Sequence, residues 1–137
     1  MEENTIIKEV ENKSFTYKNE WDDEYRLVPI LHHYANNNHI GIELFDLADY
    51  ETYCYLTTNI DSPLTNEIAG AFVNINNFSD ALKVIRKEKL GIVTNNIGYS
   101  GYCAYPEVEF DLNKLVDHSD FQKYIEEKEK SLEEEMG

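Results

Sequence analysis

The sequence is poor in basic residues. Its 137 residues include 12 Lys and Arg against 27 Asp and Glu, which gives a formal net charge of -15 and a sequence pI near 4.5. Because sequence-independent binding of nucleic acid relies on Lys and Arg to displace counterions, this composition argues against it. The same deficit argues against attachment to anionic membrane surfaces. Three explanations remain for the net negative charge: it serves a basic partner, it binds a cation, or it only keeps the protein soluble.

Cysteine and long apolar runs are also scarce. The two cysteines, Cys54 and Cys103, are too few for a secreted disulfide framework, so we expect free thiols in a reducing compartment. No stretch approaches the roughly 20 apolar residues of a membrane span, and the N-terminal residues lack a signal-peptide pattern. We therefore expect a cytoplasmic protein.

Catalytic signatures are missing as well. The sequence contains no phosphate-binding P-loop, no HExxH zinc-protease motif and no EF-hand run. Gly98–Tyr102 resembles a nucleophile elbow around Ser100, but Tyr102 stands where the second glycine is required. These absences predict a protein that is not an enzyme and that has no cofactor.

Zinc is the alternative that this sequence leaves open. The cysteines are isolated and far apart, so they lack the local ligand pairs that are typical of zinc sites. A site could still be assembled in three dimensions from both thiols and one histidine. The candidate ligands are Cys54, Cys103, His32, His33, His39 and His118.

The first half of the chain favours β-structure. Thr5–Val10 and Ser14–Tyr17 are short runs of β-favouring residues. Tyr25–Tyr34 predicts a strand that lies at a sheet edge or carries a bulge, because it contains Pro29. His39–Leu47 and Tyr50–Ile60 predict a hairpin around Leu47–Asp49.

The second half adds two helices. Asn76–Leu90 predicts a helix with Ser79 or Asp80 as its N-cap and Gly91 as its C-cap. Asn95, Asn96 and the glycines that follow them predict irregular structure, and Tyr102–Leu112 predicts a strand. Ser119 opens a last helix, whose Glu-rich final turn we expect to fray because three anions lie at the negative end of the dipole. This order predicts a single α+β domain, an antiparallel sheet with helices packed on one face.

The negative charge is concentrated at the two ends. Residues 1–25 contain 8 acids and 3 bases, and residues 107–137 contain 11 and 4, so the ends carry 12 of the 15 net charges. Within residues 1–137 we therefore distinguish three parts of one domain. These are acidic N-terminal strands and loop (1–24), a core (25–116) and an acidic C-terminal helix that frays at its end (117–137).

Two acidic clusters are candidates for contact with a basic partner. One surrounds the only Trp, and an aromatic side chain among carboxylates is a plausible anchor in a basic groove. The other alternates along a predicted strand, so that its carboxylates share one face about 6.6 Å apart, and it continues into the last helix. The simpler interpretation is that both clusters are only solvated surface. The candidate residues are Glu20, Trp21, Asp22, Asp23 and Glu24 in the first cluster, and Glu107, Glu109, Asp111, Asp117 and Asp120 in the second.

Four segments carry a resemblance to a known family. They are LTTNI at 56–60, AFVNINN at 71–77, KLG at 89–91 and, most distinctively, SGYCAYPEVEFD at 100–111. Over about residues 25–115 the chain resembles an uncharacterised domain family of phages and conjugative elements of Gram-positive bacteria. The resemblance implies a small intracellular protein of a mobile element, but it implies no particular reaction. Cys103 corresponds to a cysteine that recurs in that family.

Small acidic proteins of such elements resemble, as a class, inhibitors of host defence nucleases. The sequence therefore predicts a non-enzymatic anti-CRISPR protein that mimics nucleic acid. It would bind the basic nucleic-acid-binding surface of a type II RNA-guided nuclease and block loading of DNA or guide. Two alternatives remain: the zinc-binding protein described above, and an accessory protein of plasmid transfer or phage replication with another basic partner.

Overall fold

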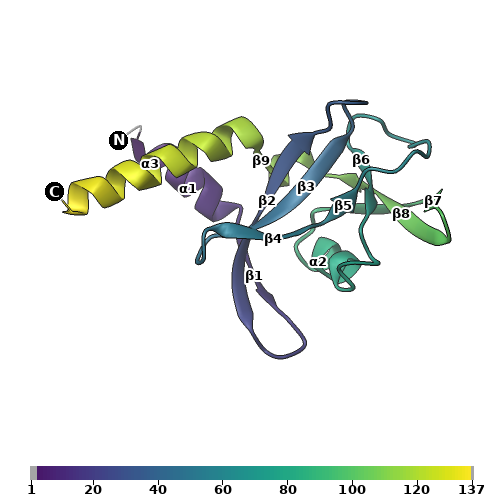
Figure 1. Ribbon diagram of the computed structural model, residues 1–137, viewed down its shortest axis with the longest axis horizontal. Coiled ribbons are helices and arrows are strands. Elements are labelled where there is room, and N and C mark those ends of the chain that lie inside the picture. The colour runs from purple at the N-terminus through teal and green to yellow at the C-terminus, as the bar shows by residue number, and fades with distance from the viewer. Residues whose placement is uncertain (1–2, 137) are drawn as a thin grey trace.

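Three α-helices and nine strands make up the computed structural model, which describes residues 3–136 (Figure 1). The α+β class predicted from the sequence is confirmed. The strands, however, divide into two sheets rather than forming one. The helical elements are α1 (Glu3–Asn12), α2 (Ala81–Lys87), a short 3-10 helix η1 (Leu112–Lys114) and α3 (His118–Met136).

The first sheet contains five strands. Four of them form an antiparallel run in the order β1-β2-β3-β4, and β9 pairs parallel with the far half of β2. The predicted hairpin around Leu47–Asp49 is confirmed as β3 and β4. The strands are β1 (Phe15–Lys18), β2 (Glu24–His33), β3 (Ile40–Asp46), β4 (Glu51–Tyr55) and β9 (Val116–Asp117).

The second sheet is antiparallel, with the strand order β5-β6-β8-β7. Its longest strands, β7 and β8, form a hairpin that turns at Gly101, the only described glycine with positive φ (61°). Asn95 and Asn96, expected to be irregular, lie inside β7 at a register shift between Val93 and Ile97. The strands are β5 (Thr57–Thr58), β6 (Gly70–Val73), β7 (Gly91–Ser100) and β8 (Cys103–Phe110).

Pro29 lies in the interior of a sheet, not at the edge or bulge that the sequence predicted. The Arg26 carbonyl accepts from the Leu47 N–H on the β3 side, and alternate residues of a strand direct their backbone groups the same way. The nitrogen of Pro29 therefore faces the opposite side. There, the pairing with β1 has ended at Leu27 and the pairing with β9 has not begun before Ile30, so no ladder hydrogen bond is lost.

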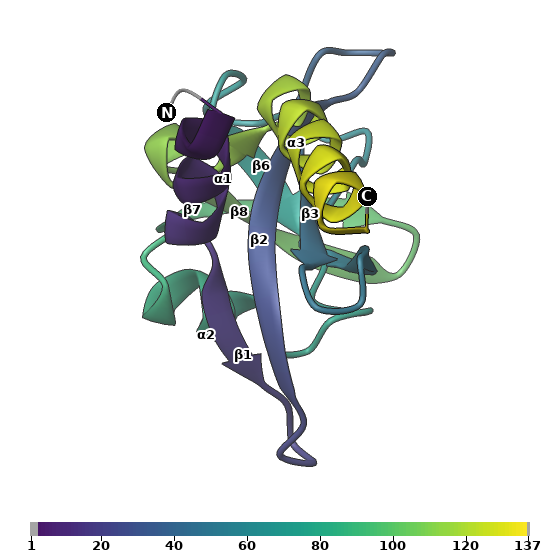
Figure 2. The ribbon, with the colours of Figure 1, turned by 90° about the vertical axis from the view of Figure 1, so that its left-hand side faces the viewer.

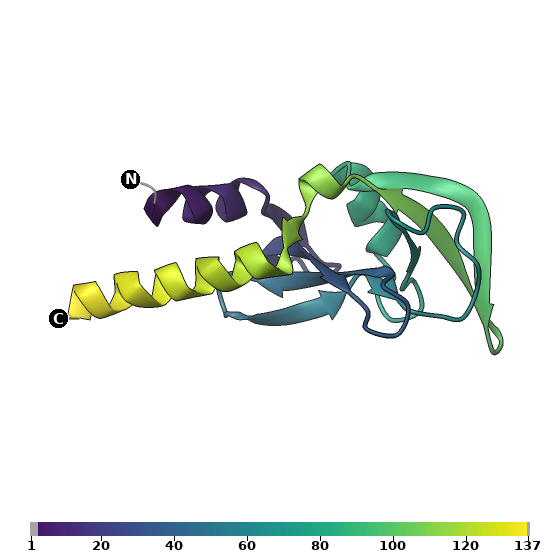
Figure 3. The ribbon, with the colours of Figure 1, turned by 90° about the horizontal axis from the view of Figure 1, so that it is seen from above.

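The first sheet is buried on both faces. Leu27, Ile42 and Leu44 belong to the larger core, which the second sheet and α2 complete. Val28 and Ile30, on the other face of the same sheet, pack in a second core beneath α1 and α3. Figures 2 and 3 show these two helices lying side by side over that face, and α1 and α3 also contact each other. Helix α1 and the first half of α3, which belong to the acidic ends, thus contribute side chains to the folded core.

Residues 5–10 form part of helix α1, so the β-structure predicted there is wrong. Ile6, Ile7 and Val10 are spaced so that one helix face carries all three, and they pack in the core beneath α1 and α3, where Val10 is fully buried. β-Branched residues favour strands only modestly, and burial of such a face outweighs that preference.

Helix α2 is shorter than predicted and has different ends. The Asn74 carbonyl accepts from the Phe78 N–H at 3.0 Å, so turns occupy the residues before Ala81. Asp80 is the N-cap residue, but its carboxylate caps no backbone N–H and instead accepts from the Tyr17 hydroxyl at 2.6 Å. Lys89, with φ 55°, ends the helix in place of Gly91, which begins β7.

Helix α3 continues to Met136. The expected fraying of its Glu-rich last turn concerns motion, so it stays a prediction. No helix within residues 3–136 is long and apolar enough to cross a membrane.

Candidate functional site: an acidic hairpin tip

The first predicted cluster forms the tip of the β1–β2 hairpin, which projects from the body of the molecule (Figure 2). Trp21 is 75% exposed, the largest exposed fraction of any Trp, Tyr or Phe in the described chain except that of Tyr102. The four flanking carboxylates are exposed as well. The hairpin tip consists of Glu20, Trp21, Asp22, Asp23 and Glu24.

The backbone of the hairpin tip is held by Asn19. Its side-chain oxygen accepts from the N–H groups of Trp21 and Asp23, both at 2.9 Å. The Asn19 N–H donates to the Asp23 carbonyl at 3.0 Å, and the Asp22 N–H donates to the Asn19 carbonyl. Asp22 has φ 64°, a conformation that Asp tolerates better than most residues. These bonds fix the tip as a turn that presents Trp21 outward before any partner binds.

Little positive charge offsets the carboxylates of the hairpin tip. One ion pair involves it, Lys18 to Asp22 at 4.0 Å, and both side chains are more than half exposed. Such an exposed pair contributes roughly 0–1 kcal/mol. The tip therefore presents an aromatic ring in a field of net negative charge.

The second predicted cluster does not form an exposed row of carboxylates. Glu107 is fully buried, whereas Glu109, two residues further along β8, is exposed. The expected contact of Glu107 with a partner is wrong, because each of its oxygens is occupied inside the protein. Glu107 accepts from the Thr65 N–H (3.0 Å) and hydroxyl (2.8 Å), the Asn66 N–H (3.3 Å) and the Asn96 amide (2.7 Å).

The charge of Glu107 is stabilised by these donors. Burial removes the carboxylate from water and by itself raises the pKa of Glu107. Hydrogen bonds from Thr65, Asn96 and Asn66 outweigh that effect, so that the pKa of Glu107 lies below its ordinary value of 4.5. The side chain joins the 65–66 loop to the β7–β8 ribbon and has a structural role.

The remaining acids of that cluster mostly bind neighbouring backbone. Asp111 accepts from the Asn113 N–H and caps η1. Asp117 accepts from the N–H and hydroxyl of Ser119 at the start of α3, and these hydrogen bonds lower the pKa of Asp117. Asp120 lies 3.9 Å from the Lys123 ammonium. Figure 1 shows β9 and the start of α3 on the opposite side of the molecule from the hairpin tip.

The candidate zinc ligands are dispersed. Cys54 lies in β4 and Cys103 begins β8, in different sheets. Burial raises the pKa of the Cys54 thiol to about 12, which disfavours the thiolate that zinc binds. Within residues 3–136 no three His, Cys, Asp or Glu side chains are grouped to hold a metal ion.

Two of the histidines instead meet a buried carboxylate that the sequence did not single out. His32 Nε2 lies 2.8 Å from Glu43 Oε1, and the His118 ring lies 4.6 Å from the His32 ring. The Thr52 hydroxyl donates to the other oxygen of Glu43. The hydrogen bond to His32 is the main reason that the pKa of Glu43 is lowered. The strand pairing Ile30↔Glu43 placed these groups together, which no local motif could predict.

A second feature missed from sequence is a basic-rimmed cavity between β1 and α2. Lys18 comes from the strand that leads to the hairpin tip, and Lys83 and Lys87 come from the helix. In the sequence Lys18 is more than 60 residues away from Lys83 and Lys87. Only the docking of α2 against β1 brings them together.

The fold and the site define a small two-sheet α+β domain with a projecting acidic hairpin. The chain belongs to the family named domain of unknown function (DUF4313), whose profile matches residues 30–130. This membership agrees with the resemblance to an uncharacterised domain family, and the match also includes most of α3. No curated protein and no solved structure matches the chain.

Proposed function

We propose that this protein is a non-enzymatic inhibitor that binds the basic nucleic-acid-binding surface of a nuclease. The observation that carries the proposal is the hairpin tip, where Trp21 is 75% exposed between four exposed carboxylates. Trp is enriched at the centres of protein interfaces, where it often supplies a large share of the binding energy.

The chemistry of the hairpin tip fits a basic groove with an apolar pocket. Carboxylates accept hydrogen bonds from Lys and Arg, and Trp binds cations against the face of its ring. The net charge of -15 accelerates association with a positive surface, and dissolved salt screens this attraction. Because the turn is already held by Asn19, less conformational entropy is lost on binding.

A type II RNA-guided nuclease is the proposed target. Such enzymes hold guide and target strands in positively charged channels, where a projecting acidic hairpin can take the place of a phosphate backbone. The resemblance of the sequence to small acidic proteins of phages and mobile elements supports this choice. In the proposed mechanism the hairpin tip enters the channel and prevents the loading of DNA or guide.

The test is a cleavage assay with purified type II nucleases, with the protein added before or after the guide RNA. Two variants probe the hairpin tip: W21A, and a variant in which Glu20, Asp22, Asp23 and Glu24 become the corresponding amides. The matched control changes four exposed acids of α3, Glu126, Glu129, Glu133 and Glu134, to Gln. It removes the same charge from a different element.

Inhibition is expected when the protein is added first, and it should weaken between about 0.05 M and about 0.2 M salt. Both tip variants should lose at least about tenfold in potency, an effect typical of a central anchor residue. Loss of potency in the α3 control to the same degree would show that overall charge, not the hairpin tip, causes inhibition. No inhibition of any type II enzyme would reject the proposed target, and capture of another basic protein that depends on the tip would favour an accessory function instead.

A further inference from the structure

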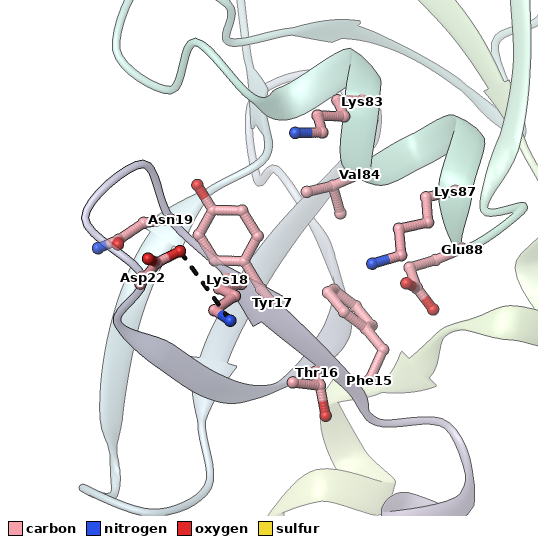
Figure 4. Close-up of a pocket in the computed structure, with 10 residues that line it drawn as sticks. All are labelled: Phe15, Thr16, Tyr17, Lys18, Asn19, Asp22, Lys83, Val84, Lys87 and Glu88. Carbon is pink, nitrogen blue, oxygen red and sulfur yellow. Dashed lines mark ion pairs between the residues drawn. The ribbon is translucent and has the colours of Figure 1, made fainter.

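A cavity of about 280 Å³ lies between strand β1 and helix α2. Its floor is apolar and aromatic. It is formed by Phe15, Tyr17 and Val84, each of which is at most 8% exposed. Lysines from both elements line its rim (Figure 4). An apolar floor below a few charged groups is typical of a site for a small molecule.

The floor of the cavity is held in place by its neighbours. The Tyr17 hydroxyl donates a 2.6 Å hydrogen bond to the Asp80 carboxylate just before α2. The Tyr17 ring also packs edge-on against Phe78, with the centroids 5.5 Å apart. The position of the Tyr17 ring is therefore fixed from two sides, which reduces the entropy that a bound ligand would have to restrict.

The rim carries positive charge in a strongly acidic chain. Lys83 and Lys87 are one helical turn apart, and Figure 4 shows both extending from α2 toward β1. Both are exposed, and neither forms an ion pair with any residue of the described chain, although the sequence contains 27 acids. Lys18 also lines the cavity from β1 and forms its ion pair with Asp22, at 4.0 Å. The ammonium groups of Lys83 and Lys87 are available to an anion.

The charges on the rim limit which anion fits. Asp22 and Glu88 also line the cavity, so its three lysines leave a net charge of +1. A polyanion such as nucleic acid would meet those carboxylates and the strongly negative remainder of the protein. A volume of about 280 Å³ is near the lower end for ligand pockets. Both limits favour a compact molecule with one ring and one anionic group.

The geometry points to a binding site for a small aromatic anion, with its ring against Tyr17 and Phe15 and its carboxylate or phosphate at Lys83 and Lys87. Nothing in the proposed nuclease inhibition requires this site. It uses different side chains from the hairpin tip, with Asp22 alone common to both.

The test is a titration of ¹⁵N-labelled full-length protein, followed by amide chemical shifts, with four probes. Benzoate and phenyl phosphate carry both the ring and the charge, benzyl alcohol carries only the ring, and inorganic phosphate carries only the charge. We expect saturable shifts confined to residues 15–19 and 83–88 for the first two probes. Benzyl alcohol and inorganic phosphate should bind at least about fivefold more weakly, because each lacks one of the two contacts.

The variant K83Q/K87Q should bind phenyl phosphate at least about fivefold more weakly than the unaltered protein. Because both lysines are exposed, the fold should be unaffected, and K83Q alone serves as a milder second variant. The matched control is K123Q/K130Q on α3, where both side chains are 68% exposed. It should bind normally.

Three results would overturn the site. They are the absence of saturable shifts with both aromatic anions, equal binding of inorganic phosphate and phenyl phosphate, and unchanged binding by K83Q/K87Q. Equal weakening by the α3 control would show a general charge effect and would overturn it too.

Discussion

The Asn96 amide donates a 2.7 Å hydrogen bond to the carboxylate of Glu107 across the register shift between β7 and β8. Gly70, on the neighbouring strand β6, leaves room for this carboxylate, since a Cβ at Gly70 would lie 2.6 Å from Glu107 Oε2. A buried anion thus joins three segments of the chain through donors from Asn96, Thr65 and Asn66. Removing one partner of such a group is costly, because the others stay buried without a hydrogen bond.

Substitution of Glu107 should therefore destabilise the protein. E107A should lower the free energy of unfolding by at least about 3 kcal/mol, because it leaves several buried donors without an acceptor. E107Q should lower it by about 1–3 kcal/mol, because an amide offers fewer acceptors to the same donors. E109Q, two positions along the strand and exposed, is the control and should change stability by less than about 0.5 kcal/mol. Urea denaturation followed by circular dichroism measures all three, and equal effects at 107 and 109 would contradict the buried network.

Acid should remove the contribution of Glu107. Its pKa in the folded protein is below the ordinary value of 4.5, so its stabilising effect is fully present above 4.5 and is lost as the pH falls through the folded-state pKa. The difference in unfolding free energy between the unaltered protein and E107Q should be largest near neutral pH and shrink in acid. Denaturation series at several pH values measure this difference, which removes the effect of the other carboxylates. A difference that stays constant would contradict an ionised, buried Glu107.

Quenching of Trp21 fluorescence by ions should report the negative electrostatic potential at the hairpin tip. Trp21 is the only Trp, and four exposed carboxylates surround it, so a cationic quencher should be concentrated there and an anionic one repelled. Caesium should therefore quench more efficiently than iodide, relative to free tryptophan, and added salt should reduce the difference. Converting the four acids to amides should abolish the preference. Equal quenching by both ions would show that the tip lacks the field inferred for it.

Replacing Lys89 with Gly should stabilise the protein. Lys89 has φ 55° at the end of α2, where Leu90 N–H donates to the Ile85 carbonyl and Lys89 N–H to the Arg86 carbonyl, the Schellman arrangement. Gly adopts this conformation without the roughly 1–2 kcal/mol cost of an L-residue, and its unfolded-state entropy offsets about 0.5–1 kcal/mol of the gain. K83G, at an exposed position inside the helix, is the control and should destabilise by about 1 kcal/mol. Thermal unfolding measures both, and a lower midpoint for K89G would contradict the prediction.

The core beneath α3 should be sensitive to truncation. Phe121 is 5% exposed, and its ring lies 4.7 Å from that of Phe45 and 5.6 Å from that of Tyr124. F121A should cost about 3–5 kcal/mol. L132A, on the same helix but 53% exposed, should cost less than about 0.5 kcal/mol. A small effect of F121A in chemical denaturation would mean that α3 contributes little to the fold.

Local patterns predicted the parts of the fold that depend on neighbouring residues. The β3–β4 hairpin follows from alternation around a short turn, and the exposed hairpin tip follows from five consecutive polar or aromatic residues. Strand alternation could not predict that Glu107 is buried while Glu109 is exposed, because it cannot foresee donors 42 positions away at Thr65. Similarly, nothing near Ile6 or Lys83 indicates α1 packing on β2 or α2 facing β1. Those contacts are decided by tertiary burial.

The gap between β1 and β9 beside Pro29 also has a consequence for the order in which the chain folds during synthesis. Ile30 and Leu31 emerge from the ribosome well before the partners that complete their sheet, Val116 and Asp117. Until then that stretch of β2 has one bare side, and the apolar face under α3 is uncovered. A nascent chain in this state exposes a β-edge that can pair with other chains. Pro29 has no N–H on the side of β2 that is still unpaired. The unpaired edge is therefore a poorer template for pairing with another chain.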